Sequence, residues 1–92
     1  MAKMECKVAD VRFDMIRLSV RKNNGGVLSG YMTSSNVACM PDLISQLGVE
    51  DNKLDVYIDD KVSFSFLGTI TDVNIAPGQQ QEQELVIMFD FE

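Results

Sequence analysis

Apolar and polar residues alternate along most of the chain, which is the pattern of strands that bury one face. Within residues 3–22 the apolar positions change phase twice, after Val8 and again at Ile16. A slip of one residue moves side chains to the opposite face, so each change of phase predicts a bulge, a sharp bend or a strand break. We therefore expect one long bent strand, or two, in residues 3–22.

The sequence NNGG, residues 23–26, separates this region from a second apolar run at residues 27–32. An Asn-Gly pair between two strands is typical of a hairpin turn whose central residues take positive φ. A phosphate-binding loop would need a helix directly after the glycines, and the residues that follow are strand-like. The sequence thus predicts a turn, in which valine at Gly25 would cost about 1–2 kcal/mol of stability.

Residues 34–48 carry the one helical pattern of the chain, and we predict a helix at about residues 41–47. Pro41 suits the first turn of a helix and Gly48 suits its C-terminal end. A further capped turn at Ser34 or Ser35 is an open alternative. The apolar residues that recur every three or four positions, and that we expect to face the core, are Val37, Met40, Leu43, Ile44 and Leu47.

Two more alternating runs follow, at residues 54–59 and 62–66, and a tight turn at residues 59–61 joins them. The second run continues beyond Gly68 until Pro77-Gly78 ends it. A glycine inside a strand, beside a slip of phase, predicts a bulge or a barrel corner.

The last run, residues 85–91, is apolar on both faces. Leu85, Ile87, Phe89 and Phe91 form one face, and Val86 and Met88 add apolar surface to the other. Such a strand needs cover on both sides. Either it lies inside a barrel beneath the helix, or a second subunit covers it; we favour a homodimer with residues 85–91 at or near the interface.

The order strand, strand, strand, helix, strand, strand, strand predicts a mainly β fold with one short helix, as a single domain of residues 1–92. Five to seven short antiparallel strands describe a small barrel or half-barrel. The position of the helix matches an OB-type barrel, while a split barrel or an α+β roll fits as well. The apolar share of 46% and the charged share of 24% are those of a globular protein.

Catalytic motifs are missing from the sequence. Histidine is absent, which removes the commonest general base and the commonest transition-metal ligand. No Gly-x-Ser-x-Gly, Walker or dinucleotide-binding glycine pattern occurs. Cys6 and Cys39 are far apart and are expected to be buried core residues. We therefore expect no enzyme, no cofactor and no metal.

Targeting signals are also missing. No apolar run approaches the roughly 20 residues of a membrane-spanning helix. The N-terminal stretch MAKMECKVAD is charged and lacks the apolar core of a secretory signal. We expect a cytoplasmic protein.

The net charge of −6 is unevenly distributed. Residues 1–22 carry six cations and three acids, a net +3, whereas residues 23–92 carry two cations and eleven acids, a net −9. Arg17, Ser19 and Arg21 share one strand face, with Tyr31 expected near them. This basic stripe either pairs with acidic neighbours across the sheet or binds an anionic ligand. The candidate cations are Arg12, Arg17, Arg21 and Lys22.

The densest acidic set includes Asp55, Asp59 and Asp60. Asp55 and Asp59 are four residues apart on a strand, hence about 13 Å apart, which is too far to share one metal ion. We interpret the set as a solvated face or as a docking surface for a basic partner.

The spacing of Arg17 and Arg21 is that of the Arg-x-x-x-Arg arm of small cyclic-di-nucleotide-binding barrels of the PilZ type, but the accompanying Asp/Asn-x-Ser-x-x-Gly strand is missing, so we claim no family. We expect a non-catalytic binding module, foremost a small acidic domain that binds another protein through its acidic surface or an exposed strand edge. The alternative is a binder of an anion, a cyclic nucleotide or nucleic acid that uses the basic N-terminal strands.

Overall fold

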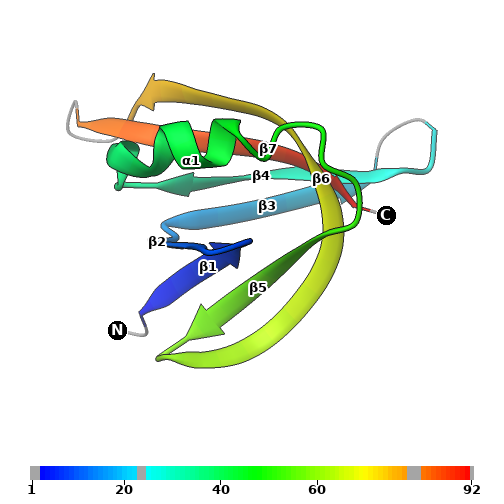
Figure 1. Ribbon diagram of the computed structural model, residues 1–92, viewed down its shortest axis with the longest axis horizontal. Coiled ribbons are helices and arrows are strands. Elements are labelled where there is room, and N and C mark those ends of the chain that lie inside the picture. The colour runs from blue at the N-terminus through cyan, green and yellow to red at the C-terminus, as the bar shows by residue number, and fades with distance from the viewer. Residues whose placement is uncertain (1–2, 23–24, 79–81, 92) are drawn as a thin grey trace.

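Seven strands and a short helical segment make up the computed structural model, which describes residues 3–22, 25–78 and 82–91. The elements are β1 (Met4–Val8), β2 (Val11–Asp14), β3 (Arg17–Lys22), β4 (Leu28–Ser34), η1 (Val37–Cys39), α1 (Met40–Ile44), β5 (Asn52–Ile58), β6 (Lys61–Pro77) and β7 (Gln83–Phe91). Neighbouring strands are antiparallel and form one sheet in the order β2-β1-β5-β6-β7-β4-β3 (Figure 1). This confirms the mainly β half-barrel with one short helix.

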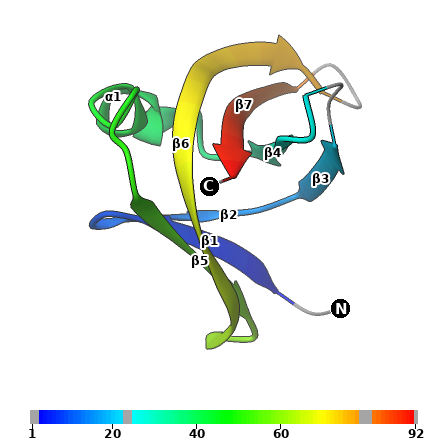
Figure 2. The ribbon, with the colours of Figure 1, turned by 90° about the vertical axis from the view of Figure 1, so that its right-hand side faces the viewer.

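The two outer strands of the sheet, β2 and β3, are consecutive in the chain and are separated by Met15 and Ile16 alone. The backbone N–H of Met15 donates to the carbonyl of Met4 at 2.9 Å, and that of Ile16 donates to the carbonyl of Thr33 at 2.8 Å. The chain therefore passes at this point from one end of the sheet to the other. The curled sheet converges here, and β3 and β1 diverge away from it (Figure 2). We call the region between them the open side.

Strand β6 bends the sheet, as Figure 1 shows. Its first half pairs with β5, its second half pairs with β7, and Gly68 pairs with both. A Cβ atom on Gly68 would lie 2.9 Å from the carbonyl oxygen of Asp90, so only glycine fits this close approach without a shift. The barrel corner predicted at Gly68 is confirmed. The bulge lies three residues later, at Thr71, where the register with β7 shifts between Ile70 and Asp72.

Residues 4–22 form three strands, where the sequence predicts one or two. The first change of phase is a two-residue hairpin at Ala9 and Asp10, with Val8 opposite Val11. The second is the passage between the two outer strands. Both changes of phase are thus strand breaks, and four strands rather than three precede the helix.

The turn predicted around NNGG does join two antiparallel strands, with Lys22 opposite Leu28. Residues 23 and 24 lie outside the described residues. Gly26, in the described part of this turn, has a φ of +82°. The expected strain of valine at Gly25 depends on residue 24, so it stays a prediction. Consecutive residues at positive φ occur at Asp59 and Asp60, between β5 and β6, where they form a two-residue hairpin.

The helical segment is shorter than predicted, because α1 ends at Ile44. Pro41 occupies the first turn as predicted, and Leu43 is fully buried. Ile44 and Leu47, however, are 43% and 40% exposed, so the prediction that they face the core was wrong. The chain leaves the helix before Leu47, which instead bridges to β6. No helix within the described residues has the length and apolarity needed to cross a membrane.

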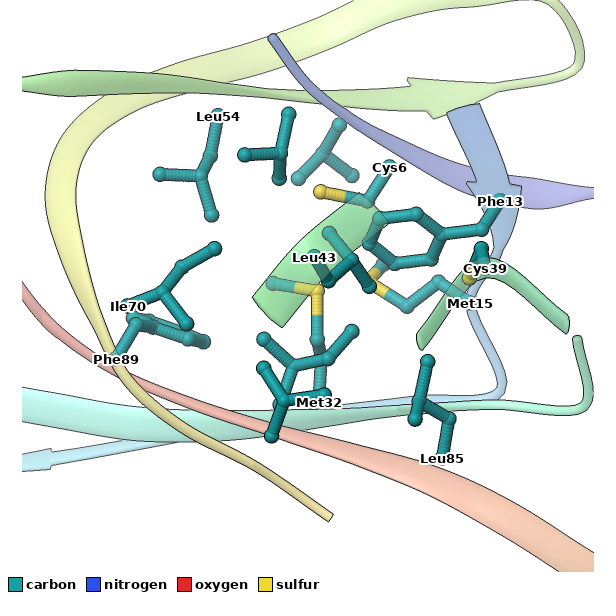
Figure 3. Packing of buried hydrophobic residues seen from close by; sticks show 14 residues of the cluster. Cys6, Phe13, Met15, Met32, Cys39, Leu43, Leu54, Ile70, Leu85 and Phe89 are labelled. Atoms are coloured by element: carbon teal, nitrogen blue, oxygen red, sulfur yellow. The ribbon is translucent and has the colours of Figure 1, made fainter. Parts of the chain in front are cut away.

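The core lies inside the curled sheet, where side chains from both halves meet Leu43 of the helix (Figure 3). Both cysteines are free and buried, as the sequence predicts. Burial, with a smaller contribution from Asp55, raises the pKa of Cys6 to about 12. The buried core residues are Cys6, Val8, Phe13, Met15, Met32, Cys39, Leu43, Leu54, Val56, Ile70, Val73, Leu85, Ile87 and Phe89.

Strand β7 lies in the middle of the sheet, between β6 and β4. Leu85, Ile87 and Phe89 are buried in the core, which is the first of the two arrangements expected for this strand. On the outer face Val86 is half-buried and Met88 is 42% exposed. Both edges of β7 are paired, so a homodimer through residues 85–91 would have to use this outer face.

Candidate binding surface

The four candidate cations do not form one stripe. Arg12 lies on β2, which pairs with β1, whereas Arg17, Arg21 and Lys22 lie on β3, which pairs with β4. These are the two opposite ends of the sheet order. Arg12 and the cations of β3 therefore have separate surroundings.

Arg12 is engaged within the chain. Its Nη2 donates hydrogen bonds to Oε1 of Glu5 at 2.9 Å and to Oδ1 of Asp60 at 2.8 Å, and its guanidinium lies 4.1 Å from the centre of the Tyr57 ring. The hydrogen bond to Glu5 raises the pKa of Arg12 above its ordinary value. Arg12 thus connects the β1–β2 hairpin with the β5–β6 turn. Exposed ion pairs of this kind contribute little to stability.

The three candidate carboxylates, Asp55, Asp59 and Asp60, also accept hydrogen bonds from within the chain. Asp59 accepts a hydrogen bond from the backbone N–H of Lys3 at 2.9 Å, and Asp60 accepts the arginine hydrogen bond described above. Asp55 accepts a hydrogen bond from the hydroxyl of Ser65. Asp59 and Asp60 thus hold the β5–β6 hairpin against the N-terminal segment, whereas the bond of Asp55 lies within the hairpin. Among the described residues, no group of three or more Cys, Asp or Glu side chains could hold a metal ion.

Asp14 is a further carboxylate that accepts hydrogen bonds, and the sequence pattern did not indicate this role. Its oxygens accept hydrogen bonds from Oγ of Ser34 at 2.9 Å, from Oγ of Ser35 at 2.6 Å and from the backbone N–H of Ser35 at 3.2 Å. These bonds tie the end of β2 to the end of β4, where the two outer strands converge. Burial raises the pKa of Asp14, but the hydrogen bonds from Ser35 and Ser34 outweigh it and hold the pKa below its ordinary value.

Replacing Asp14 by alanine is expected to lower the free energy of unfolding by about 1–3 kcal/mol at neutral pH, because partly buried hydroxyls lose their acceptor. A carboxylate with a lowered folded pKa stabilises the fold fully above its unfolded pKa, near pH 4, and the contribution disappears as the pH falls through the folded pKa. Urea denaturation should therefore show the difference between wild type and D14A narrowing below pH 4. The exposed Asp10→Ala change is the control, and a difference for D14A that stays constant down to pH 2.5 would contradict the assignment.

Strand β3 carries three cations that have no hydrogen-bond or ion-pair partner among the described residues. Arg17, Ser19 and Arg21 lie on its outer face, and Ser19 pairs with Tyr31 of β4, which places the tyrosine where the sequence predicts. Within the described part of the chain, the side chains of Arg17, Arg21 and Lys22 form no hydrogen bond or ion pair. All three residues are exposed.

Leu18 and Val20 form the inner face of β3, next to the open side, and other side chains cover them only in part. Leu18 is opposite the buried Met32 and is half-buried, whereas Val20 is opposite Gly30 and is 42% exposed. Alternation alone predicts burial for this face. Val20 is exposed because the sheet diverges here and no further strand of the described residues lies beside β3.

The beginning of β4 continues this apolar region. Val27 and Leu28 are 44% and 45% exposed, and with Gly26 and Phe91 they line an open pocket of about 320 Å³. Lys22 lies beside it, because its Cε is 3.8 Å from the point where a Cβ of Gly26 would be. We define the β3 surface as Arg17, Val20, Arg21, Lys22, Val27 and Leu28.

An aromatic row connects this pocket with the core. The ring of Phe91 lies 4.4 Å from that of Phe66, and both lie 5.3 Å from the ring of Phe89. The ring of Phe66 in turn stacks on that of Phe64, with 6.3 Å between the ring centres. Phe64 is 44% exposed. The floor of the pocket is therefore held by packed rings.

A smaller pocket, of about 100 Å³, lies on the outer face. It contains Arg21 and Tyr31, but the carboxylate of Asp90 also lines it. Sites for small molecules occupy about 300–1,000 Å³. The size and the carboxylate make this pocket a poor site for a cyclic dinucleotide. Its lining residues are Arg21, Ser29, Gly30, Tyr31, Thr71, Met88, Phe89 and Asp90.

The sequence matches no protein-family model and no curated protein. Among solved structures, the fold is similar to that of the 43 kDa tail protein of prophage MuSo2 from Shewanella oneidensis, with 10% sequence identity and a TM-score of 0.44. The similarity covers 98% of this chain and 28% of that protein's chain.

Proposed function

We propose that this chain is a non-catalytic protein-binding module that holds its partner on the β3 surface. The observation that carries the proposal is the juxtaposition of exposed apolar side chains with unpaired cations on an outer strand. Val20, Val27 and Leu28 are 42–45% exposed at the open side with Lys22 beside them, and Arg17 and Arg21 lie on the other face of the same strand. An apolar centre with a charged rim is the usual composition of a protein interface.

The acidic end of the molecule is the weaker candidate for this role. Asp55, Asp59 and Asp60 accept hydrogen bonds from within the chain, so a basic partner would have to compete with them. Within the described residues, the side chains of Arg17, Arg21 and Lys22 form no hydrogen bond or ion pair with which a partner would have to compete. Of the two binding modes expected from the sequence, the exposed strand edge is therefore the one we propose.

A non-catalytic role agrees with the chemistry of the side chains. The chain contains no histidine to serve as a base. Burial raises the pKa of both cysteine thiols, which disfavours the thiolate that a nucleophile requires.

The test is a matched pair of charge reversals. R21E/K22E removes two cations from the β3 surface, and K53E/K61E makes the same change of net charge on the β5–β6 hairpin. Each protein is immobilised and exposed to lysate of the source cells, and the retained protein is identified and titrated back in purified form. We expect R21E/K22E to weaken its binding about tenfold or more and K53E/K61E to leave it unchanged. Equal losses in both variants, or no loss in R21E/K22E, would overturn the proposal.

A polyanion is the second candidate, because the same unpaired cations could contact phosphates. Affinity for an oligonucleotide would then fall steeply with salt and with Arg17→Ala and Arg21→Ala together. The net charge of −6 opposes this function. A titration with a labelled single-stranded oligonucleotide at low salt decides between the two, and we expect no binding.

A further inference from the structure

Strand β3 leaves one backbone edge open. Among the described residues it pairs with β4 alone, in a continuous register of six residue pairs from Arg17 to Lys22. Alternate residues of such a strand direct their N–H and C=O groups away from the sheet. The strand has no proline and no bulge in its pairing with β4, which are two of the devices that block strand addition. Its cations are a third such device, and they repel a basic strand while they attract an acidic one.

The side chains of β3 specify the strand that would fit beside it. Side chains of neighbouring strands that lie opposite each other share a face of the sheet. An added strand would therefore place alternate side chains beside Arg17 and Arg21 on the outer face, and the others beside Leu18 and Val20 on the inner face. Carboxylates complement the first set and apolar side chains complement the second.

At its C-terminal end, β3 again combines a cation with exposed apolar side chains. Lys22 provides a third cation, next to the pocket that Val27, Leu28 and Phe91 line. An apolar side chain at the end of the added segment could enter this pocket while a neighbouring carboxylate meets the lysine. The side chain of Val20, which is 42% exposed in the free chain, would then be buried.

We infer that the partner contributes an extended acidic segment, with carboxylate and apolar residues in alternation, that adds to the sheet as a strand along β3. This inference rests on the proposed function and names the class of ligand for the same surface. Strand addition obtains its affinity from main-chain hydrogen bonds and its specificity from alternate side chains.

A second copy of this chain fits the edge poorly. Antiparallel pairing of two β3 strands about their centre would bring Arg17 of one copy near Arg21 of the other, and like charges opposite each other destabilise a sheet. The charge of β3 therefore favours an acidic partner over self-association.

The first test uses synthetic peptides as probes. A fluorescein-labelled eight-residue peptide that alternates aspartate and valine is titrated with the full chain at low and at moderate salt. We expect it to bind, and we expect a peptide of four aspartates followed by four valines to bind about tenfold more weakly, since it has the same composition without the alternation. R17E/R21E should weaken binding about tenfold or more, and K53E/K61E should not. Equal binding of both peptides would overturn the inference.

The second test separates strand addition from attraction by charge. Two versions of the alternating peptide carry N-methyl groups on alternate backbone nitrogens, in the two possible phases. Only one phase directs its N–H groups at β3, so only one version should lose binding. Equal affinities of the two versions would overturn strand addition, and the proposed function would still stand if R21E/K22E abolishes binding of the natural partner. Preferential binding of an oligonucleotide over the acidic peptide would overturn both.

Discussion

Alanine at Gly30 is expected to lower the free energy of unfolding by about 3 kcal/mol, because it forces backbone apart. A Cβ atom at Gly30 would overlap the carbonyl oxygen of Ser19 and would lie 3.2 Å from Cα of Val20. Both atoms belong to the backbone of β3, so no rotation of a side chain can relieve the contact. Since β4 is the only described strand that pairs with β3, we expect β3 to move away.

Urea denaturation of Gly30→Ala and Gly48→Ala measures this effect against a matched control. Gly48 has a φ of +75° and open space where its Cβ would lie, so alanine there meets only the backbone penalty of about 1–2 kcal/mol. We expect Gly30→Ala to be the more destabilising change and to weaken peptide binding to β3 as well. A loss no greater than that of Gly48→Ala would show that β3 is not held as closely as the structure places it.

Alanine at Phe89 is expected to cost about 3–5 kcal/mol, the usual loss for a buried phenylalanine. The side chain is 1% exposed and contacts the rings of Phe66 and Phe91, so its removal leaves a cavity between the core and the pocket. In a domain of this size each kcal/mol lowers the melting temperature by about 4–8 °C. The melting temperature of Phe89→Ala should therefore fall by about 12–40 °C.

Thermal unfolding monitored by circular dichroism checks this value. Phe64→Ala is the control, because Phe64 belongs to the same aromatic row but is 44% exposed, and we expect a loss below about 1 kcal/mol. If Phe89→Ala does not fold, Phe89→Leu retains most of the volume and should cost less than about 1.5 kcal/mol. Similar losses for Phe64→Ala and Phe89→Ala would be inconsistent with the aromatic row described here.

The positions of the strands and of their changes of phase could be predicted because they depend on neighbouring residues, although the sequence did not show that both changes of phase in residues 3–22 are strand breaks. The change of phase after Val8 is the β1–β2 hairpin, and the change at Ile16 is the passage between the two outer strands. Gly68 marks the corner of β6, since the backbone of β7 approaches too closely for a side chain. The alternation of apolar and polar residues within a strand indicates which side chains face the core, and it can be read from a few neighbouring residues.

The end of the helix could not be predicted from the spacing of apolar residues alone. Ile44 and Leu47 have the spacing of a buried face, yet both are exposed because the helix ends at Ile44 and the chain turns towards β6. Positive φ values occur at Gly26 in the NNGG turn and at Asp59 and Asp60 in the β5–β6 turn. The sequence indicates a turn in both places, but it did not single out Asp59 and Asp60 as residues of positive φ.

The candidate site depended on tertiary structure almost entirely. By itself the sequence determined that the chain is mainly β, that it has no histidine and that its cations gather in residues 1–22. Only the fold decided that Arg12 meets Asp60, 48 residues away, while Arg17 and Arg21 form no ion pair with any carboxylate among the described residues. The physical reason is the strand order: β2 lies in the half of the sheet that contains the β5–β6 turn, and β3 lies at the opposite end, beside an opening that no strand of the described chain fills.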